Sequence, residues 1–143
     1  MKKAITFLYG LGDLSEYKSL SKYFHIPRID WNKSTITPKI GRVDVLVGFS
    51  LGCILAYIHA EKNKVKTLIM CSPTPAESLK TLKVKKIIFL VGEKEKWCLK
   101  EIQRVAKTLK CGWKVIVIPK ADHRIIGNYR KKLLEVVNEI ENN

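Results

Sequence analysis

The sequence predicts an α/β protein in which helices cover both faces of a six-stranded, mostly parallel sheet, giving a three-layer sandwich. Six short apolar runs alternate along the chain with helical or loop segments, the pattern typical of a parallel sheet. The 143 residues, 46% of them hydrophobic, can form one domain with a substantial core, so we expect a single domain over residues 1–143. The sequence contains no internal repeat, linker or low-complexity tract.

The expected strands are short, largely apolar runs of the kind that a buried parallel sheet requires. They span Lys2–Tyr9, His25–Ile29, Val43–Gly48, Val65–Cys71, Lys86–Val91 and Trp113–Ile118. The second run contains Pro27, which has no backbone N–H to donate, so we expect this run at an edge of the sheet. The polar segment Trp31–Gly41 shows only weak periodicity, and we expect a loop there.

The expected helices carry apolar residues at a spacing that places them on one buried face. They span residues 14–24, 51–62, 95–109 and 129–140, with one or two further helical turns over residues 76–82. The Asp13–Glu16 segment fits a D-x-x-E capping box at the start of the first helix. Gly112 lies close to the C-cap position of the helix over 95–109, and Pro119 ends the last strand.

The chain is strongly basic, with a net charge of +14 from 27 Lys plus Arg against 13 Asp plus Glu. Such a charge favours contact with anions such as nucleic acid, acidic lipid or phosphate-bearing substrates. The basic residues are nevertheless spread along the chain, and no RNA-binding or helix-turn-helix motif occurs. A solvated basic surface is the simplest interpretation, and we do not expect nucleic-acid binding as the main role.

The cysteine pattern indicates neither a disulfide framework nor a metal site. The four cysteines lie far apart, form no C-x-x-C pair and have no histidine at metal-ligand spacing. We therefore expect reduced thiols, a cytoplasmic protein and no bound metal. No apolar run reaches 18 residues, so we expect no membrane span, and the short run Ala4–Tyr9 lacks the cleavage site of a signal peptide.

A buried strand, a sharp turn and a buried helix are predicted by one stretch, VDVLVGFSLGCILAYIHA. Its centre, GFSLG, fits the G-x-S-x-G nucleophile elbow, in which a strained turn lifts the Ser50 hydroxyl clear of the backbone. Gly48 and Gly52 have no Cβ to collide across this turn. The N–H of Leu51 begins the helix and points into the same space, where a helix N-terminus favours an anion.

A serine hydroxyl needs a base to become a nucleophile, and the chain offers three histidines. His25 begins the expected edge strand, and His59 lies late in the elbow helix, more than two turns from Ser50. We interpret both as structural. His123 follows the last expected strand and therefore lies at the same end of the sheet as Ser50, which makes it the candidate base.

The base in turn needs a carboxylate that fixes its tautomer and stabilises the imidazolium. Glu93 and Glu95 both lie in the loop after the fifth expected strand, at the correct edge of the sheet. Asp122 is adjacent to His123, and a neighbouring side chain rarely reaches the far ring nitrogen. Either glutamate can supply the acid on this reasoning.

On these residues the chain resembles a small α/β-hydrolase over nearly its whole length, with serine, acid and histidine in the family's order. The family usually places the acid three residues after a glycine that ends the penultimate strand. Counting from Gly92 gives Glu95, with Glu93 in reserve. The same resemblance implies an oxyanion hole made by the backbone N–H groups of Leu11 and Leu51.

Two features depart from the family. Tyr9 stands where the loop after the first strand often has histidine, and Glu95 replaces the commoner aspartate. The resemblance also implies a minimal fold, because the two usual leading strands are absent and residues 72–85 are too few for a lid domain. We therefore expect an open, lidless site, which is compatible with a bulky substrate or with a homodimer that covers the site.

The resemblance implies a serine hydrolase that cleaves a small-molecule carboxylic ester or thioester through Ser50, His123, Glu95 and an acyl-enzyme. This chemistry requires no metal and no organic cofactor. The basic surface favours an anionic substrate. Two alternatives remain open: a non-catalytic binding protein on the same scaffold, and a protein that docks to anionic partners through its basic surface.

Overall fold

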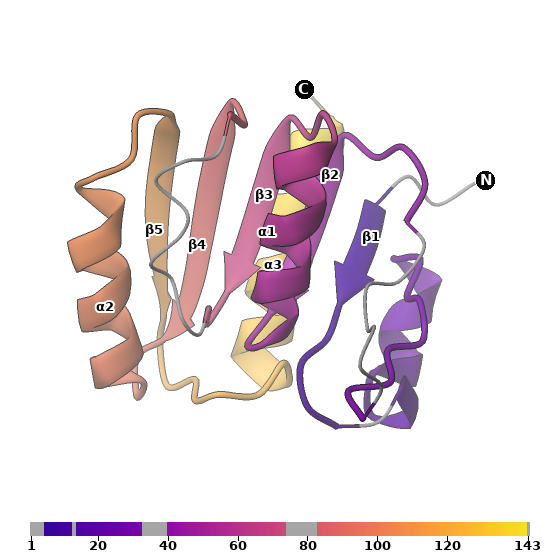
Figure 1. Ribbon diagram of the computed structural model, residues 1–143. Coiled ribbons are helices and arrows are strands. Elements are labelled where there is room, and N and C mark those ends of the chain that lie inside the picture. The colour runs from indigo at the N-terminus through magenta and orange to yellow at the C-terminus, as the bar shows by residue number, and fades with distance from the viewer. Residues whose placement is uncertain (1–4, 13, 33–39, 74–82, 143) are drawn as a thin grey trace.

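A five-stranded sheet forms the centre of the computed structural model, which describes residues 5–12, 14–32, 40–73 and 83–142. The strands follow chain order from one edge of the sheet to the other, and every neighbouring pair is parallel (Figure 1). They are β1 (Ile5–Leu8), β2 (Val45–Phe49), β3 (Thr67–Cys71), β4 (Lys86–Gly92) and β5 (Gly112–Ile118). Each overlaps one of the apolar runs that the sequence predicts as a strand.

The second of the six expected strands, His25–Ile29, does not form, so the prediction of six strands is wrong for the described part of the chain. His25 makes a single parallel bridge with the outer edge of β1. Pro27 then offers no N–H to a strand ladder. The backbone N–H of Ile29 instead donates to the buried hydroxyl of Tyr9 at 2.6 Å, so a side chain replaces the ladder at this position.

Helices cover both faces of the sheet, with α1 in front of it and α3 behind it in Figure 1. The helical elements are the 3₁₀-helix η1 (Leu14–Lys22), α1 (Gly52–Lys62), α2 (Lys96–Ala106) and α3 (Gly127–Glu141). The first expected helix is thus a 3₁₀-helix, and the turns expected over residues 76–82 lie outside the described residues. Among the described helices, none has both the length and the hydrophobicity of a transmembrane segment.

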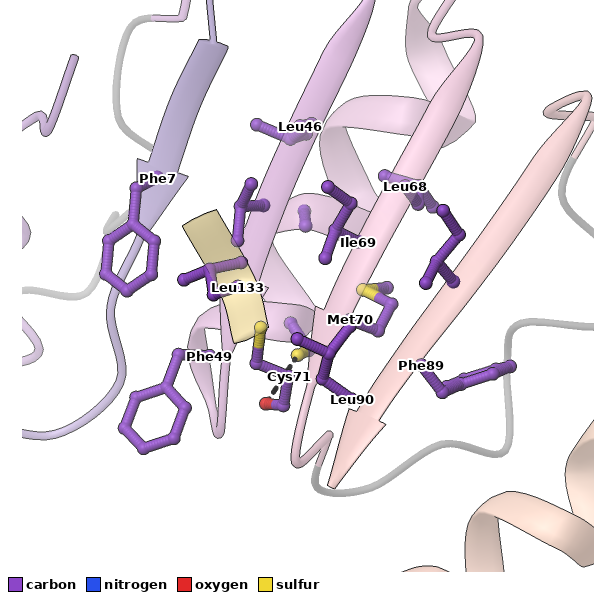
Figure 2. Close-up of a cluster of buried hydrophobic side chains, with 14 of the residues drawn as sticks. Phe7, Leu46, Phe49, Leu68, Ile69, Met70, Cys71, Phe89, Leu90 and Leu133 are labelled. Carbon is purple, nitrogen blue, oxygen red and sulfur yellow. Dashed lines mark hydrogen bonds between the residues drawn. The ribbon is translucent and has the colours of Figure 1, made fainter. Parts of the chain in front are cut away.

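The core lies between the sheet and the two helical layers. Side chains from β1 to β4 pack in one cluster with Leu133 of α3 (Figure 2). Every residue of β2 is buried, as expected for a parallel strand that is covered on both faces. The strand β5 lies at the edge of the described sheet and pairs with β4 on one side, and its residues Trp113 and Val117 remain 44% and 42% exposed.

The five strands follow chain order, but the connection between β1 and β2 first runs along the outer edge of β1, where His25 bridges. The chain then crosses to the inner side of β1 as β2, so its direction across the sheet changes here. In open parallel α/β sheets, ligands bind at the carboxyl ends of the strands beside such a change of direction. Ser50 follows β2 directly and therefore lies at this position.

Candidate active site

Ser50 occupies the sharp turn between the end of β2 and the start of α1. Its φ of 56° lies in the left-handed region, which is uncommon for a residue other than glycine and stores strain. The turn is held on both sides: the Ser50 N–H donates to the carbonyl of Cys71 in β3 at 2.9 Å, and its carbonyl accepts the Cys53 N–H at 3.0 Å. This is the geometry that the G-x-S-x-G pattern predicts.

The two glycines of the turn are required by close backbone contacts. A Cβ at Gly48 would lie 2.8 Å from the Cα of Cys53, at the start of α1. A Cβ at Gly52 would lie 2.1 Å from the carbonyl oxygen of Leu8, at the end of β1. The glycines therefore let α1 start directly against both β1 and β2.

His123 joins Ser50 to Glu95. Its Nε2 atom lies 2.9 Å from the Ser50 Oγ, and its Nδ1 atom is hydrogen-bonded to the Glu95 Oε1. The imidazole also packs on the ring of Phe49, with 5.0 Å between ring centroids. His123 lies in the loop between β5 and α3, and its half-exposed side chain keeps the site open to solvent.

The Glu95 carboxylate is held at both oxygens. While Oε1 faces His123, Oε2 accepts the Gly92 N–H at 2.7 Å and the Ser72 hydroxyl at 2.6 Å. Burial alone would raise the pKa of Glu95, but the hydrogen bonds from His123, Ser72 and Gly92 and the charge of His123 outweigh it and hold the pKa below its ordinary value. Glu95 is therefore ionised at neutral pH.

Comparison with solved structures identifies the fold. A dienelactone hydrolase from Anabaena variabilis matches with a TM-score of 0.60 and 19% identity, over 68% of this chain and 48% of that protein. MGS-MChE2, an α/β hydrolase enzyme from a sediment metagenome of the lagoon of Mar Chica, matches with a TM-score of 0.69 and 15% identity, over 97% of this chain and 90% of that protein. A carboxylesterase structure from the thaumarchaeon Nitrososphaera gargenis matches with a TM-score of 0.66 and 11% identity, over 96% of this chain and 89% of that protein. The chain has the α/β-hydrolase fold.

In the comparisons with known proteins, the α/β-hydrolase fold is supported by solved structures and not by sequence matches. The sequence matches no family model and no curated protein. The chain spans 48% of the length of the dienelactone hydrolase and 60% of that of an uncharacterized Bacillus cereus protein that it also matches. Because one fold carries many activities, the function has to be argued from the site residues.

The reserve acid Glu93 does not meet His123. Its Oε1 instead accepts the backbone N–H of Lys120 at 2.8 Å, in the loop between β5 and α3 that also carries His123. Lys120 adopts a left-handed φ of 60°, so this hydrogen bond supports a turn that would otherwise be unfavourable. Of the two glutamates that the sequence left open, the structure brings Glu95 to the imidazole and places Glu93 in a structural contact.

The loop that carries Glu95 and the loop that carries His123 are tied together through their backbones. The Glu93 N–H donates to the carbonyl of Ile118 at 2.9 Å, and the Lys94 N–H donates to that of Ala121 at 3.0 Å. A Cβ at Gly92 would lie 2.4 Å from the Ala121 carbonyl oxygen, so only glycine permits this approach. Main-chain contacts therefore set the spacing between acid and base.

The loop after β1 lies against the elbow of the α/β-hydrolase fold. A Cβ at Gly10 would lie 3.0 Å from the backbone nitrogen of Leu51 and 3.2 Å from the Cβ of Ser50. The loop that carries Leu11 thus borders the turn that carries Leu51. The Leu11 side chain is 67% exposed, so Leu11 is not held by burial in the core.

The remaining titratable candidates lie away from the serine or are otherwise paired. His25 bridges to the outer edge of β1. His59 is buried in α1, where burial lowers its pKa and its Nδ1 lies 3.3 Å from the Asn63 amide nitrogen. The Asp122 carboxylate accepts hydrogen bonds from Arg124, the nearer at 2.8 Å, which lower its pKa. The described residues contain no group of three or more side chains that could hold a metal ion.

Two residues that contact the site were not predicted for it. Ser72 follows β3 and is fully buried, and Tyr129 in the first turn of α3 is fully buried as well. The Ser72 Oγ lies 2.6 Å from the Glu95 Oε2 and 2.7 Å from the Tyr129 hydroxyl oxygen. A polar residue directly after an apolar strand was the available signal for Ser72. Nothing local distinguishes Tyr129 from an ordinary core tyrosine.

Proposed function

We propose that the protein is a serine hydrolase that cleaves a carboxylic ester or thioester. In this proposal Ser50 is the nucleophile, His123 the general base and Glu95 the acid that orients the imidazole and stabilises its charged form. The observation that carries the proposal is the continuous contact from the Glu95 carboxylate through His123 to the Ser50 hydroxyl, 2.9 Å from Nε2.

The hydrogen-bond pattern supports these roles. An ionised Glu95 can only accept, so the His123 Nδ1 carries a hydrogen and donates it. In the neutral ring, Nε2 then has a free lone pair directed at the Ser50 hydroxyl. This is the tautomer that a general base requires, and the backbone ties between the two loops keep it in place.

The proposed reaction has two steps. The Ser50 Oγ bonds to the substrate carbonyl carbon while His123 takes the hydroxyl proton, and the bond to the alcohol or thiol breaks as His123 returns that proton to the leaving group. Water then repeats the sequence on the acyl-enzyme and releases the acid. The N–H groups of Leu51 and Leu11 are proposed to bind the oxyanion. This assignment is supported by the α1 N-terminus and by the contact of Gly10 with the elbow.

The substrate class is supported less specifically. The similar structures include a dienelactone hydrolase and a carboxylesterase, which favours an ester bond. The net charge of +14 favours an anionic substrate, since a basic surface concentrates anions near the site. The half-exposed His123 favours a substrate that reaches an open site from solvent.

Hydrolysis of short-chain nitrophenyl esters and of matched acyl thioesters tests the proposal. We compare the wild-type protein with Ser50→Ala and with the control Ser21→Ala, which changes an exposed serine of η1 outside the site. Turnover by wild type and Ser21→Ala, with loss in Ser50→Ala at unchanged thermal stability, is the expected result. Equal turnover by wild type and Ser50→Ala would contradict the proposal and leave a non-catalytic binding protein as the better account.

A further inference from the structure

The carboxylate of Glu95 contacts two buried hydroxyl groups in series, first that of Ser72 and then that of Tyr129. The Ser72 Oγ contacts Glu95 at 2.6 Å and the Tyr129 hydroxyl at 2.7 Å, and that hydroxyl lies 3.0 Å from the carbonyl oxygen of Leu90 in β4. Ser72 and Tyr129 are both 0% exposed, so water does not compete for these contacts. The chain links β3, β4 and α3 to the acid.

The direction of these hydrogen bonds follows from the ionised acid. A carboxylate accepts and cannot donate, so Ser72 gives its one hydroxyl hydrogen to Glu95. The phenol of Tyr129 also has one hydrogen, and two acceptors lie within its reach: the Leu90 carbonyl, to which it donates at 3.0 Å, and the Ser72 Oγ at 2.7 Å. Because the Ser72 hydrogen goes to Glu95, any hydrogen in the contact between Ser72 and Tyr129 comes from the phenol. Tyr129 therefore supports the hydroxyl of Ser72, and Ser72 donates to Glu95.

The backbone conformation of Ser72 would suit glycine better, which indicates that the serine is present for its hydroxyl group. Its φ of 46° lies in the left-handed region. Glycine would adopt this backbone conformation with less strain than serine does. What serine supplies and glycine lacks is the hydroxyl that reaches Glu95.

We propose that Ser72 and Tyr129 are positioning residues that hold the Glu95 carboxylate ionised and directed at His123. The proposal rests on the function proposed above for Ser50, His123 and Glu95. A glutamate has one more rotatable bond than the aspartate usual in this fold, so its carboxylate has more orientations to exclude. The Gly92 N–H and the Ser72 hydroxyl fix Oε2, which leaves Oε1 for the imidazole.

The other groups around Glu95 are neutral at physiological pH. Burial raises the pKa of the Cys98 thiol of α2 to about 12 and that of the Cys71 thiol of β3 further still. Burial also raises the pKa of Tyr129 well above its ordinary value, so the phenol keeps the hydrogen that it donates. Among the groups that lower the pKa of Glu95, His123 is the one that becomes charged in the proposed reaction, whereas Ser72 and the Gly92 N–H donate as neutral groups.

The test is a ¹³C NMR titration of the Glu95 carboxyl carbon in the full chain, with fluorophosphonate labelling rates measured on the same samples. Ser72→Gly and Ser72→Ala both remove the hydroxyl, but only glycine also relieves the left-handed backbone. We expect both variants to raise the titration midpoint of Glu95 by about 1 pH unit, which is the effect of one hydrogen bond to a charged group. We expect labelling to slow by about tenfold in both, and Tyr129→Phe to shift the midpoint in the same direction by less.

A backbone role for Ser72 would give a different pattern, with Ser72→Gly titrating and labelling like wild type while Ser72→Ala does not. That result, or an unchanged Glu95 midpoint in both variants, overturns the proposal. In a Glu95→Gln background, Ser72→Gly should cause little further loss of labelling, whereas an undiminished tenfold loss would show that Ser72 acts elsewhere. The titration does not depend on turnover, so an unlabelled wild type with shifted midpoints would contradict the proposed function and leave the role of Ser72 and Tyr129 in holding Glu95 intact.

Discussion

The Nε2 atom of His123 lies 2.9 Å from the Oγ atom of Ser50, although 73 residues separate them along the chain. Both residues are held in place by the backbone of the elements that carry them. Ser50 is presented by a strained turn between β2 and α1, and His123 by a loop that the backbone ties to the loop of Glu95. Rigid elements that hold reacting groups in contact lower the entropic cost of reaching a transition state.

The choice of acid predicts a difference between two neighbouring glutamates. Glu95→Gln leaves the side-chain shape but removes the charge that orients and stabilises His123, so we expect the esterase rate to fall by roughly 100-fold or more. Glu93→Gln retains an oxygen that can accept the Lys120 N–H, and we expect a rate within a few-fold of wild type. Steady-state kinetics on one ester measures both. Equal losses in the two variants would contradict the assignment of Glu95.

The lowered pKa of Glu95 predicts a pH-dependent contribution to stability. Burial raises this pKa, but the hydrogen bonds from His123, Ser72 and Gly92 lower it by more, so the folded value lies below the unfolded value of about 4.3. A carboxyl group of this kind stabilises the fold above the unfolded pKa, and the contribution is lost as pH falls through the folded value.

Urea denaturation of wild type and Glu95→Gln between pH 7 and pH 3 measures this contribution. We expect the stability advantage of wild type to be constant from pH 7 to about pH 5 and to shrink below it. An advantage that grew as the pH fell would mean that the pKa of Glu95 is raised in the folded state.

Alanine should destabilise the protein strongly at Gly52, in the tight elbow, and only slightly at Gly41, outside it. In Gly52→Ala the new Cβ would lie 2.1 Å from the Leu8 carbonyl oxygen, so the backbone of β1 or α1 must move, and we expect destabilisation of about 3 kcal/mol or more. Gly41→Ala meets no atom within 4 Å, and we expect a change of about 0.5 kcal/mol or less. Denaturant midpoints compare the two, and similar midpoints would contradict the packing described for the elbow.

Tyr9 predicts a change in stability without a change in chemistry. Tyr9→Phe removes the hydroxyl that accepts the Ile29 N–H at 2.6 Å in a buried setting, so we expect a loss of about 1–3 kcal/mol of unfolding free energy. The control Tyr23→Phe changes a residue that is 44% exposed and should have little effect. The rate per folded molecule should stay close to that of wild type. A large fall in that rate would indicate that Tyr9 takes part in the reaction.

Most of the sheet could be predicted because the strands of a buried parallel sheet are short continuous apolar runs, as in β2 and β4. The run His25–Ile29 looked similar but has Pro27 in its middle, and a side chain 20 residues earlier, Tyr9, takes the hydrogen bond that a strand would have used. A contact of that kind leaves no local pattern in the sequence.

The positions of the site residues could be predicted as far as they follow from topology. Ser50, Glu95 and His123 each follow a strand, and parallel strands end at one edge, so proximity could be expected before any distance was known. The choice between Glu93 and Glu95 depended on the backbone ties of one loop. Ser72 and Tyr129 meet across 57 residues, and only the packing of α3 against the sheet brings them together.

Fluorophosphonate labelling followed by mass spectrometry of the modified peptide tests the central claim most directly, because the probe reacts with an activated serine and not with an idle one. Wild type, His123→Ala and Ser50→Ala are treated side by side. The account predicts a single modified residue, Ser50, in wild type, with labelling lost or greatly slowed in His123→Ala and absent in Ser50→Ala. A folded wild type that is not labelled at Ser50, or a His123→Ala variant labelled as fast as wild type, would contradict it.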